Sequence, residues 1–298
     1  MSDSRFHLAR DGQVTAHTYR RLGYDRLTQG VYGHWPISDG LDQWEERRQK
    51  FLRHVEAVVA AYQKVVLYGP TALQVLGVAL PSLAEDWERC HLLVGPNVYR
   101  PTRRNVIAHR TQYLPPIWKG VNGLPLLSPV DHLLQLSGTT LRGLIEVGDG
   151  LMRRRNPLIT LSEMERRLEE LDCMPNVARV RSILCHLRPG TESLYETRTR
   201  LTLVNAGLPC PIVNLPVDCR AYDLTYHLDM GYKVEKVGIE YDGAVHVGNR
   251  EQMEFDASRR RRLQDEGWLI ITVTAGQLRQ PSEFIHSVRN ALAQRGRK

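Results

Sequence analysis

The chain has 298 residues, of which 42% are hydrophobic and 24% are charged, and its formal net charge is +7. This composition is typical of a globular protein of two domains, and it excludes a fibrous or low-complexity chain. The basic surplus suits a polyanionic partner but does not establish one. Five scattered cysteines, none in a CxxC pair, argue against a structural zinc site and indicate reduced thiols.

The sequence also bears on the compartment. Its first residues lack the apolar segment of a signal peptide, and no apolar run is long enough to span a bilayer. We therefore expect a cytoplasmic protein that does not associate with membranes.

Residues 1–127 predict an α+β region. A short β-ribbon is expected where Arg26-Leu27 and Gly30-Val31-Tyr32 flank a turn, followed by a helix from about Asp42 to Tyr62. Residues 91–94 and 105–109 are expected to form paired strands around a basic turn at 100–104. This turn either contacts phosphate or, as the favoured interpretation, is a solvated loop.

Residues 128–188 predict a helical connector, so that the part of the chain before residue 189 is mainly helical. In this connector, Arg153, Arg154 and Arg155 follow the end of a predicted helix. Cations are favoured at that position by the helix dipole, which is sufficient reason for the cluster.

Residues 189–298 have a readable order of elements. A helix is closed by Gly207 and Pro209, and Trp268 begins a nearly continuous β-rich run that is typical of a central buried strand. The predicted order is helix, three strands, helix, strand, helix (αβββαβα), a mixed α/β sandwich. The expected ranges are 193–206, 211–217, 222–230, 236–242, 251–266, 268–274 and 282–295.

Carboxylates are concentrated in the hairpin that the second and third of these strands are expected to form. Glu240 and Asp242 fall on one face of the third strand, because side chains alternate along a strand. Asp229 ends the second strand and is expected to converge with them. Acids are depleted from strands and costly to bury unpaired, so a shared metal or polar site is the favoured interpretation.

Order and residues together resemble the PD-(D/E)xK nuclease fold, in the branch related to very-short-patch-repair (Vsr) endonucleases. The matching residues span about 188–296 and include Glu196 with Arg200, Asp229, Glu240-Tyr-Asp-Gly243, His246, Asp256 and Gly267-Trp268. The resemblance implies a restriction-endonuclease-like mixed sheet. The first part of the chain faintly resembles an abortive-infection type IV antitoxin region, in which the ribbon at 26–32 would be the wing of a degraded winged helix.

The resemblance also implies a DNA endonuclease that depends on Mg²⁺ or Mn²⁺, in repair or defence. Asp229 and Glu240 would be metal ligands, and Glu196 an outer ligand or a water-orienting group. Asp242 stands where most of the superfamily has a catalytic lysine, so His246 becomes the candidate general base or phosphate partner. The candidates for contact with nucleic acid are Arg200, Lys236, Arg259 and Arg260; Lys236 lies two strand steps before Glu240 and is a weaker substitute for the lysine.

Each assignment has a structural alternative. Glu196 completes a capping box with Ser193, Asp242-Gly243 is a common turn dipeptide, and the arginines at 259–262 form either a DNA-backbone track or a solvated helix face. His246 alone would be an exposed loop residue. The alternative function is a catalytically inactive nuclease-fold protein that binds DNA, a toxin or another protein partner as an antitoxin-like regulator.

Overall fold

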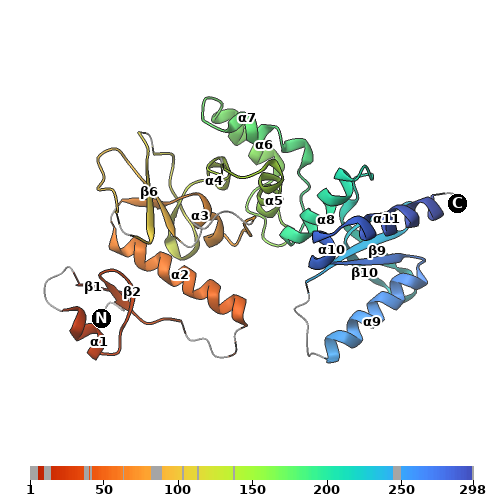
Figure 1. Ribbon diagram of the computed structural model, residues 1–298, viewed down its shortest axis with the longest axis horizontal. Coiled ribbons are helices and arrows are strands. Elements are labelled where there is room, and N and C mark those ends of the chain that lie inside the picture. The colour runs from red at the N-terminus through yellow and green to blue at the C-terminus, as the bar shows by residue number, and fades with distance from the viewer. Residues whose placement is uncertain are drawn as a thin grey trace. The chain divides into compact units, whose positions relative to one another are not determined.

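The computed structural model describes most of the chain and divides it into two compact units, coloured along the chain in Figure 1. Unit 1 comprises Met1–Val78 and Ser82–Leu136, and unit 2 comprises Ala79–Pro81 and Ser137–Lys298. Both contain helices and sheets, so the predicted mixed α/β class is confirmed. The described residues are 6–9, 15–36, 40, 42–62, 64–81, 89–102, 104–112, 114–136, 138–243 and 250–296.

The sheet of unit 2 has four strands in the order β12-β11-β10-β9. The first three strands in sequence form an antiparallel meander, and β12 lies parallel to β11. The predicted hairpin of the second and third strands is confirmed by the pairing of Met230 with Ile239 and of Tyr232 with Val237. The strands are β9 (Ile212–Cys219), β10 (Leu224–Tyr232), β11 (Val237–Asp242) and β12 (Leu269–Thr274).

Helices cover this sheet from two sides (Figure 1). Leu203 of α8 and Phe284 of α11 pack with Ile239 in one buried apolar cluster. Leu263 of α9 and Trp268 pack with Leu228 in a second cluster. The helices are α8 (Leu194–Asn205), α9 (Arg250–Asp265), α10 (Ala275–Arg279) and α11 (Ser282–Arg295), with a 3-10 turn at Arg220–Tyr222.

The last strand departs from its prediction. β12 pairs with β11 alone and is the edge of the described sheet, whereas its apolar sequence predicted a central position. Its side chains are mostly half-buried, and Leu269 is exposed. Helices can cover both faces of a parallel strand even at the edge of a sheet. An apolar run therefore indicates that the faces of the strand are covered, and it does not indicate how many strands pair with it.

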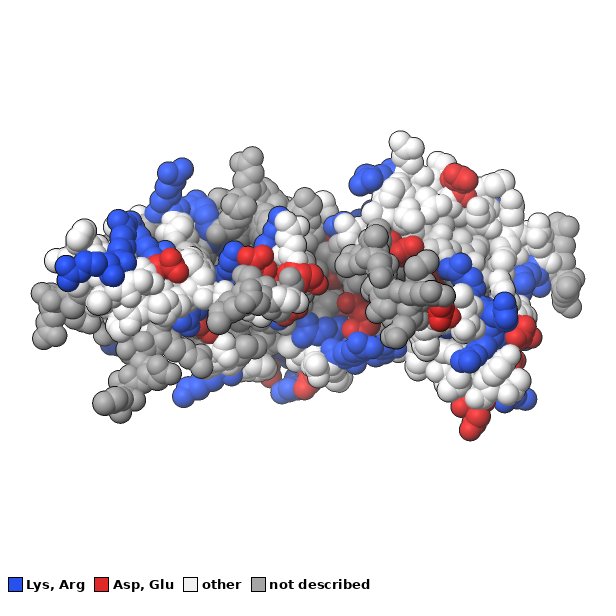
Figure 2. Space-filling model, turned by 90° about the horizontal axis from the view of Figure 1, so that it is seen from below, with Lys and Arg blue, Asp and Glu red and all other residues white. Residues whose placement is uncertain are grey.

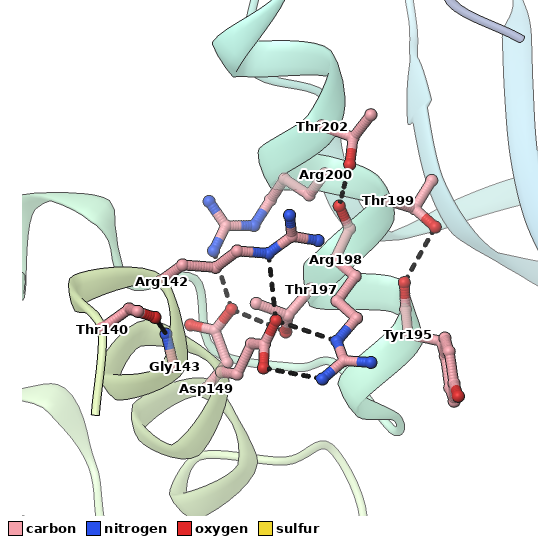
Figure 3. A network of polar contacts seen from close by, with 11 residues as sticks. Thr140, Arg142, Gly143, Asp149, Tyr195, Thr197, Arg198, Thr199, Arg200 and Thr202 are labelled. Atoms are coloured by element: carbon pink, nitrogen blue, oxygen red, sulfur yellow. Dashed lines mark hydrogen bonds and ion pairs between the residues drawn. The ribbon is translucent and has the colours of Figure 1, made fainter. Parts of the chain in front are cut away.

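The helical segment that precedes residue 189 belongs to unit 2 and contacts α8 directly. Asp149 of α5 accepts hydrogen bonds from Arg200 (2.7 Å), Thr197 (2.9 Å) and the Arg188 backbone (2.7 Å). Figure 3 shows the bonds of Asp149 with Thr197 and Arg200. Glu146 of the same helix also accepts hydrogen bonds from Arg198. The elements are α5 (Leu141–Leu151), α6 (Leu161–Glu170), α7 (Val177–Arg181) and a 3-10 turn at Leu184–His186.

These contacts move the boundary that the sequence predicted. Residues 128–188 were expected to be a separate connector, but 137–188 cluster with the sheet that follows them, and 128–136 cluster with unit 1. The Pro-Gly pair at 189–190 predicted a domain break. It lies within one unit, and the ion pair of Asp149 with Arg200 joins the segments on its two sides.

Three small sheets lie among the described residues of unit 1. The predicted ribbon is present as antiparallel β2 and β3, and β1 pairs with β3. The strands β5 and β6 are paired as expected, and their direction is parallel. The elements are β1 (His7–Leu8), α1 (Ala16–Arg21), β2 (Asp25–Thr28), β3 (Val31–Gly33), α2 (Gln43–Ala61), β4 (Val65–Leu67), α3 (Gly69–Val75), β5 (Cys90–Val94), β6 (Val106–Arg110), β7 (Trp118–Lys119), a 3-10 turn at Val121–Gly123, β8 (Pro125–Leu126) and α4 (Pro129–Leu134).

Among the helices of the described residues, none combines the length and the apolar character that crossing a bilayer requires.

The pair between Arg200 and Asp149 gives a stability prediction. Both side chains are almost fully buried, at 2% and 0% exposure. Replacing Arg200 by Ala leaves a buried carboxylate without its cation, which typically costs about 3–5 kcal/mol. We expect this loss in the free energy of unfolding measured by urea denaturation. Arg166→Ala, at a 70% exposed side chain, is the control and should change stability by less than about 0.5 kcal/mol; equal effects of the two variants would contradict the prediction.

Candidate functional site

Asp229 and Glu240 meet across the hairpin of β10 and β11. The antiparallel register that pairs Met230 with Ile239 sets them at the same level on neighbouring strands. The backbone N–H of Tyr241 donates to Oδ2 of Asp229 at 2.8 Å, which fixes that carboxylate beside β11. The structure therefore brings together the two acids for which the sequence predicted convergence.

Glu196 reaches the same place from the first turn of α8. Its side chain is buried, and this burial, with the nearby charge of Asp229, raises the pKa of Glu196 to about 7. Burial also raises the pKa of Asp229 to about 6; the Tyr241 N–H opposes this rise and the charge of Glu240 adds to it. The charge of Asp229 thus disfavours the ionisation of Glu196, and the charge of Glu240 disfavours that of Asp229.

Half of the capping box that is the structural alternative for Glu196 is present. Oγ of Ser193 accepts from the Glu196 N–H at 3.1 Å, and Oε2 of Glu196 accepts from the N–H of Glu192 at 3.0 Å, one residue before the helix cap. A cap on its own can be solvated, but this one is buried beside Asp229. The cap therefore positions the carboxylate and does not compete with a role in the site.

Glu240 is neutralised by an arginine. Arg259 of α9 pairs with Oε1 of Glu240 and donates a second hydrogen bond to the backbone oxygen of His227 at 2.9 Å. The sequence predicted that Arg259 contacts nucleic acid, but here its guanidinium is half-buried and engages the acid that was expected to bind metal.

The donor chemistry at the site suits a hard cation. Carboxylate oxygens are the ligands of Mg²⁺, and one oxygen each of Asp229 and Glu196 makes no hydrogen bond to a described residue. Within the described residues, however, no three side chains of the metal-binding types are grouped closely enough to hold an ion. The chain therefore has the right donors for Mg²⁺, while the Arg259 pair keeps Glu240 from joining them.

The structure does not place the other two predicted catalytic residues, Asp242 and His246, within the carboxylate cluster. Asp242 is exposed at the end of β11, in register with Thr274, and has polar contacts of its own. His246 falls in 244–249, outside the described residues.

One predicted nucleic-acid contact, Arg200, is corrected by the structure, and a second, Lys236, is exposed but lies away from the carboxylates. Arg200 is buried and paired with Asp149, so its guanidinium is not available to nucleic acid. Its i,i+4 spacing from Glu196 makes the two neighbours on α8, but the sequence does not reveal that its partner is Asp149. Lys236 precedes β11 in a turn, with a left-handed φ of 51°, and its Nζ donates to the Glu266 backbone oxygen at 2.7 Å. It therefore lies roughly 13 Å along the strand from Glu240, given a rise of about 3.3 Å per residue.

Arg260 fits its prediction better, because it is exposed on α9. Figure 2 shows basic side chains gathered over this helix, with carboxylates among them. The alternatives of a backbone track and a solvated face both accommodate this arrangement.

Sequence patterns missed an aromatic contact that supports the site. The rings of Tyr195 and Tyr241 stack with centroids 4.6 Å apart and an interplanar angle of 3°, and the guanidinium of Arg198 lies over Tyr195. The stack links α8 to the residue whose N–H binds Asp229. Its only sequence signal is that each tyrosine adjoins a candidate acid, Glu196 or Glu240.

Comparison with known proteins identifies relatives without a described activity. No protein-family model matches the chain. Two Mycobacterium tuberculosis proteins, uncharacterized protein MT2308 (strain CDC 1551 / Oshkosh) and uncharacterized protein Rv2248 (strain ATCC 25618 / H37Rv), are each 25% identical over 120 residues, 40% of this chain. That stretch is 44% of each relative, so the match spans less than half of their length.

One solved structure is a distant neighbour. The crystal structure of the RV2827C protein from Mycobacterium tuberculosis aligns with a TM-score of 0.35 and 16% identity, over 75% of this chain and 87% of that one.

The raised pKa values predict a pH-dependent stability. The pKa of Glu196 rises on folding from 4.5 to about 7, so the unfolded chain ionises first and this residue destabilises the fold as pH increases through that window. We expect Glu196→Gln to match the wild type near pH 4.5 and to become more stable than it above about pH 7, measured by urea denaturation in EDTA. Glu165→Gln, at an exposed position, should show no such divergence, and a pH-independent gap for Glu196→Gln would contradict the prediction.

Proposed function

We propose that the chain is a metal-dependent endodeoxyribonuclease that hydrolyses phosphodiester bonds. The observation that supports this best is the convergence of Glu196, Asp229 and Glu240, in which burial and neighbouring negative charge raise the pKa values of Glu196 and Asp229. Perturbed, partly buried acids of this kind are characteristic of functional sites. A divalent cation is the simplest group that would relieve their repulsion.

The order of elements in unit 2 gives further support. A helix, three meandering strands, a helix and a parallel strand follow one another, and the acids stand on the first helix, the second strand and the third strand. This arrangement is similar to that of PD-(D/E)xK nucleases of the Vsr-related branch, with a restriction-endonuclease-like sheet. The similarity extends to the placement of Asp229 and Glu240 as the acids on adjacent strands.

The residues divide the chemistry among themselves. Mg²⁺ or Mn²⁺ held by Asp229 and Glu240 would supply positive charge at the scissile phosphate and a bound water of lowered pKa. Glu196, whose pKa is about 7, holds or releases a proton near neutral pH and is suited to orient that water. Arg259 then exchanges its pair with Glu240 for a phosphate oxygen, since a guanidinium binds carboxylate and phosphate alike.

A second candidate function is favoured by the same ion pair. If Arg259 stays paired with Glu240, the arginine takes the place of the metal. The presence of Asp242 where the superfamily has a lysine also favours an inactive site. The chain would then be an inactive nuclease-fold protein that binds DNA or a toxin as an antitoxin-like regulator.

A cleavage assay separates the two functions. Supercoiled plasmid incubated with purified protein and Mg²⁺ or Mn²⁺ should be nicked by the wild type. Asp229→Asn and Glu240→Gln should lower the rate by about 100-fold or more, because even the loss of a residue that only supports a metal ligand typically costs about 10–100-fold.

Asp218→Asn is the matched control, since this exposed acid lies on β9 and bonds Thr225 instead of the cluster. Its rate should equal that of the wild type. A contaminating nuclease would cut equally in all four preparations, and absence of metal-dependent nicking by the wild type would favour the regulatory alternative.

Metal binding can also be measured without activity. A ligand that binds only the folded protein at 100 times its Kd adds about 2.7 kcal/mol of stability, so Mn²⁺ should raise the melting temperature of the wild type and not of Asp229→Asn. Arg259→Gln removes the cation that competes for Glu240, and we expect tighter metal binding by this variant. An unchanged melting temperature in the wild type and in Arg259→Gln at millimolar Mn²⁺ would argue against a metal site.

A further inference from the structure

The turn that follows α5 is fixed to the segment that leads into α8. The N–H of Arg154 donates to the oxygen of Thr191 at 3.3 Å, and the N–H of Gly190 donates to the oxygen of Met152 at 2.9 Å. The carboxylate of Glu192 accepts from the N–H of Arg155 at 2.8 Å. These bonds fix the backbone of the arginine cluster, which the helix dipole alone would leave at a fraying helix end.

The side chain of Arg154 is oriented by two further residues. Its Nε donates to Oε1 of Glu192 at 3.2 Å, and Nη1 donates to Oδ1 of Asn214 on β9 at 2.9 Å. A guanidinium has five N–H donors, and Nη2 makes no hydrogen bond to a described residue. The side chain is 34% exposed, so donors remain available on a group that is already held in one orientation.

Arg154 lies beside the carboxylate cluster. The residue that orients it, Glu192, gives its own N–H to Glu196. Burial is the main influence on the pKa of Asp229, and the charges of Arg259 and Arg154 both act against the rise that burial causes. Two cations from different segments, α9 and the turn after α5, therefore face the same acid.

An exposed ion pair with Glu192 is the structural alternative for this arginine. Such a pair contributes about 0–1 kcal/mol, and it gives no reason for the bond to Asn214, whose backbone takes a left-handed φ of 51°. A preorganised guanidinium with unused donors next to an acidic site is the arrangement that binds an anionic oxygen.

We propose that Arg154 binds a phosphate group of the nucleic-acid strand that occupies the Asp229 and Glu240 site. The inference rests on the proposed function and extends it, because it assigns the helical segment before residue 189 a direct contact with substrate. Glu192 and Asn214 are positioning residues that hold the guanidinium before the strand arrives.

The salt dependence of binding tests this role. A labelled duplex oligonucleotide is titrated with protein at several salt concentrations, with Ca²⁺ in place of Mg²⁺ to prevent cleavage. Each phosphate contact contributes about −0.9 to the slope of log K against log salt for duplex DNA. We expect Arg154→Ala to make the slope shallower by about that amount and to weaken binding alike for unrelated sequences.

Arg155→Ala is the matched control, because this neighbouring arginine is exposed and its side chain bonds to no described residue. It should retain the wild-type slope. A wild type that nicks plasmid and binds DNA while Arg154→Ala and Arg155→Ala have the same slope would overturn this inference and leave the proposed function standing. A wild type that neither binds nor cuts would overturn both.

Glu192→Gln provides a second test that keeps the cation, in case Arg154→Ala does not fold. An amide oxygen at residue 192 can still accept the hydrogen bond from Nε of Arg154 and hold the guanidinium, while the negative charge that repels a phosphate is removed. DNA should therefore bind more tightly at low salt with the slope retained. Equal or weaker binding by a folded Glu192→Gln protein would contradict the role of Arg154.

Discussion

The architecture of unit 2 is organised around the cost of burying negative charge. Glu196, Asp229 and Glu240 converge where a strand hairpin meets the start of a helix, and burial together with neighbouring negative charge raises the pKa values of Glu196 and Asp229. Each carboxylate is stabilised by a contact. The Tyr241 N–H donates to Asp229, the Glu192 N–H donates to Glu196, and the Arg259 guanidinium pairs with Glu240. These contacts compensate only part of the cost, since the pKa values of Glu196 and Asp229 stay raised.

The helix α8 connects this cluster to the rest of the unit. Its first turn carries Glu196, which lies near Asp229 of the hairpin, and its Thr197 and Arg200 donate hydrogen bonds to Asp149 on α5. The same helix that carries the buried Glu196 therefore also supplies the cation and the hydroxyl that stabilise the buried Asp149. The stacking of Tyr195 on Tyr241 packs this helix against β11.

The sequence predicted what depends on local pattern. The ranges of α8, α9 and α11 and the hairpin of β10 and β11 followed from periodicity and turn residues, and the convergence of Asp229 with Glu240 followed from the hairpin. The features that the sequence did not predict depend on pairing between distant residues. The edge position of β12, the parallel direction of β5 and β6, and the burial of Arg200 depend on partners far along the chain, which no local window contains. Arg154 was assigned to a helix dipole because nothing near it in sequence reveals Asn214.

The Asp149–Arg200 pair bears on how the chain can be divided. A fragment that begins at residue 189 includes every residue of the family resemblance, yet it would leave the Arg200 guanidinium without its carboxylate in the interior of the fragment. A buried unpaired cation is costly enough to unfold a small domain. The smallest autonomous piece that keeps this charge paired therefore starts near residue 137, and relatives that share the sheet would need either this helical segment or an uncharged residue at the position of Arg200.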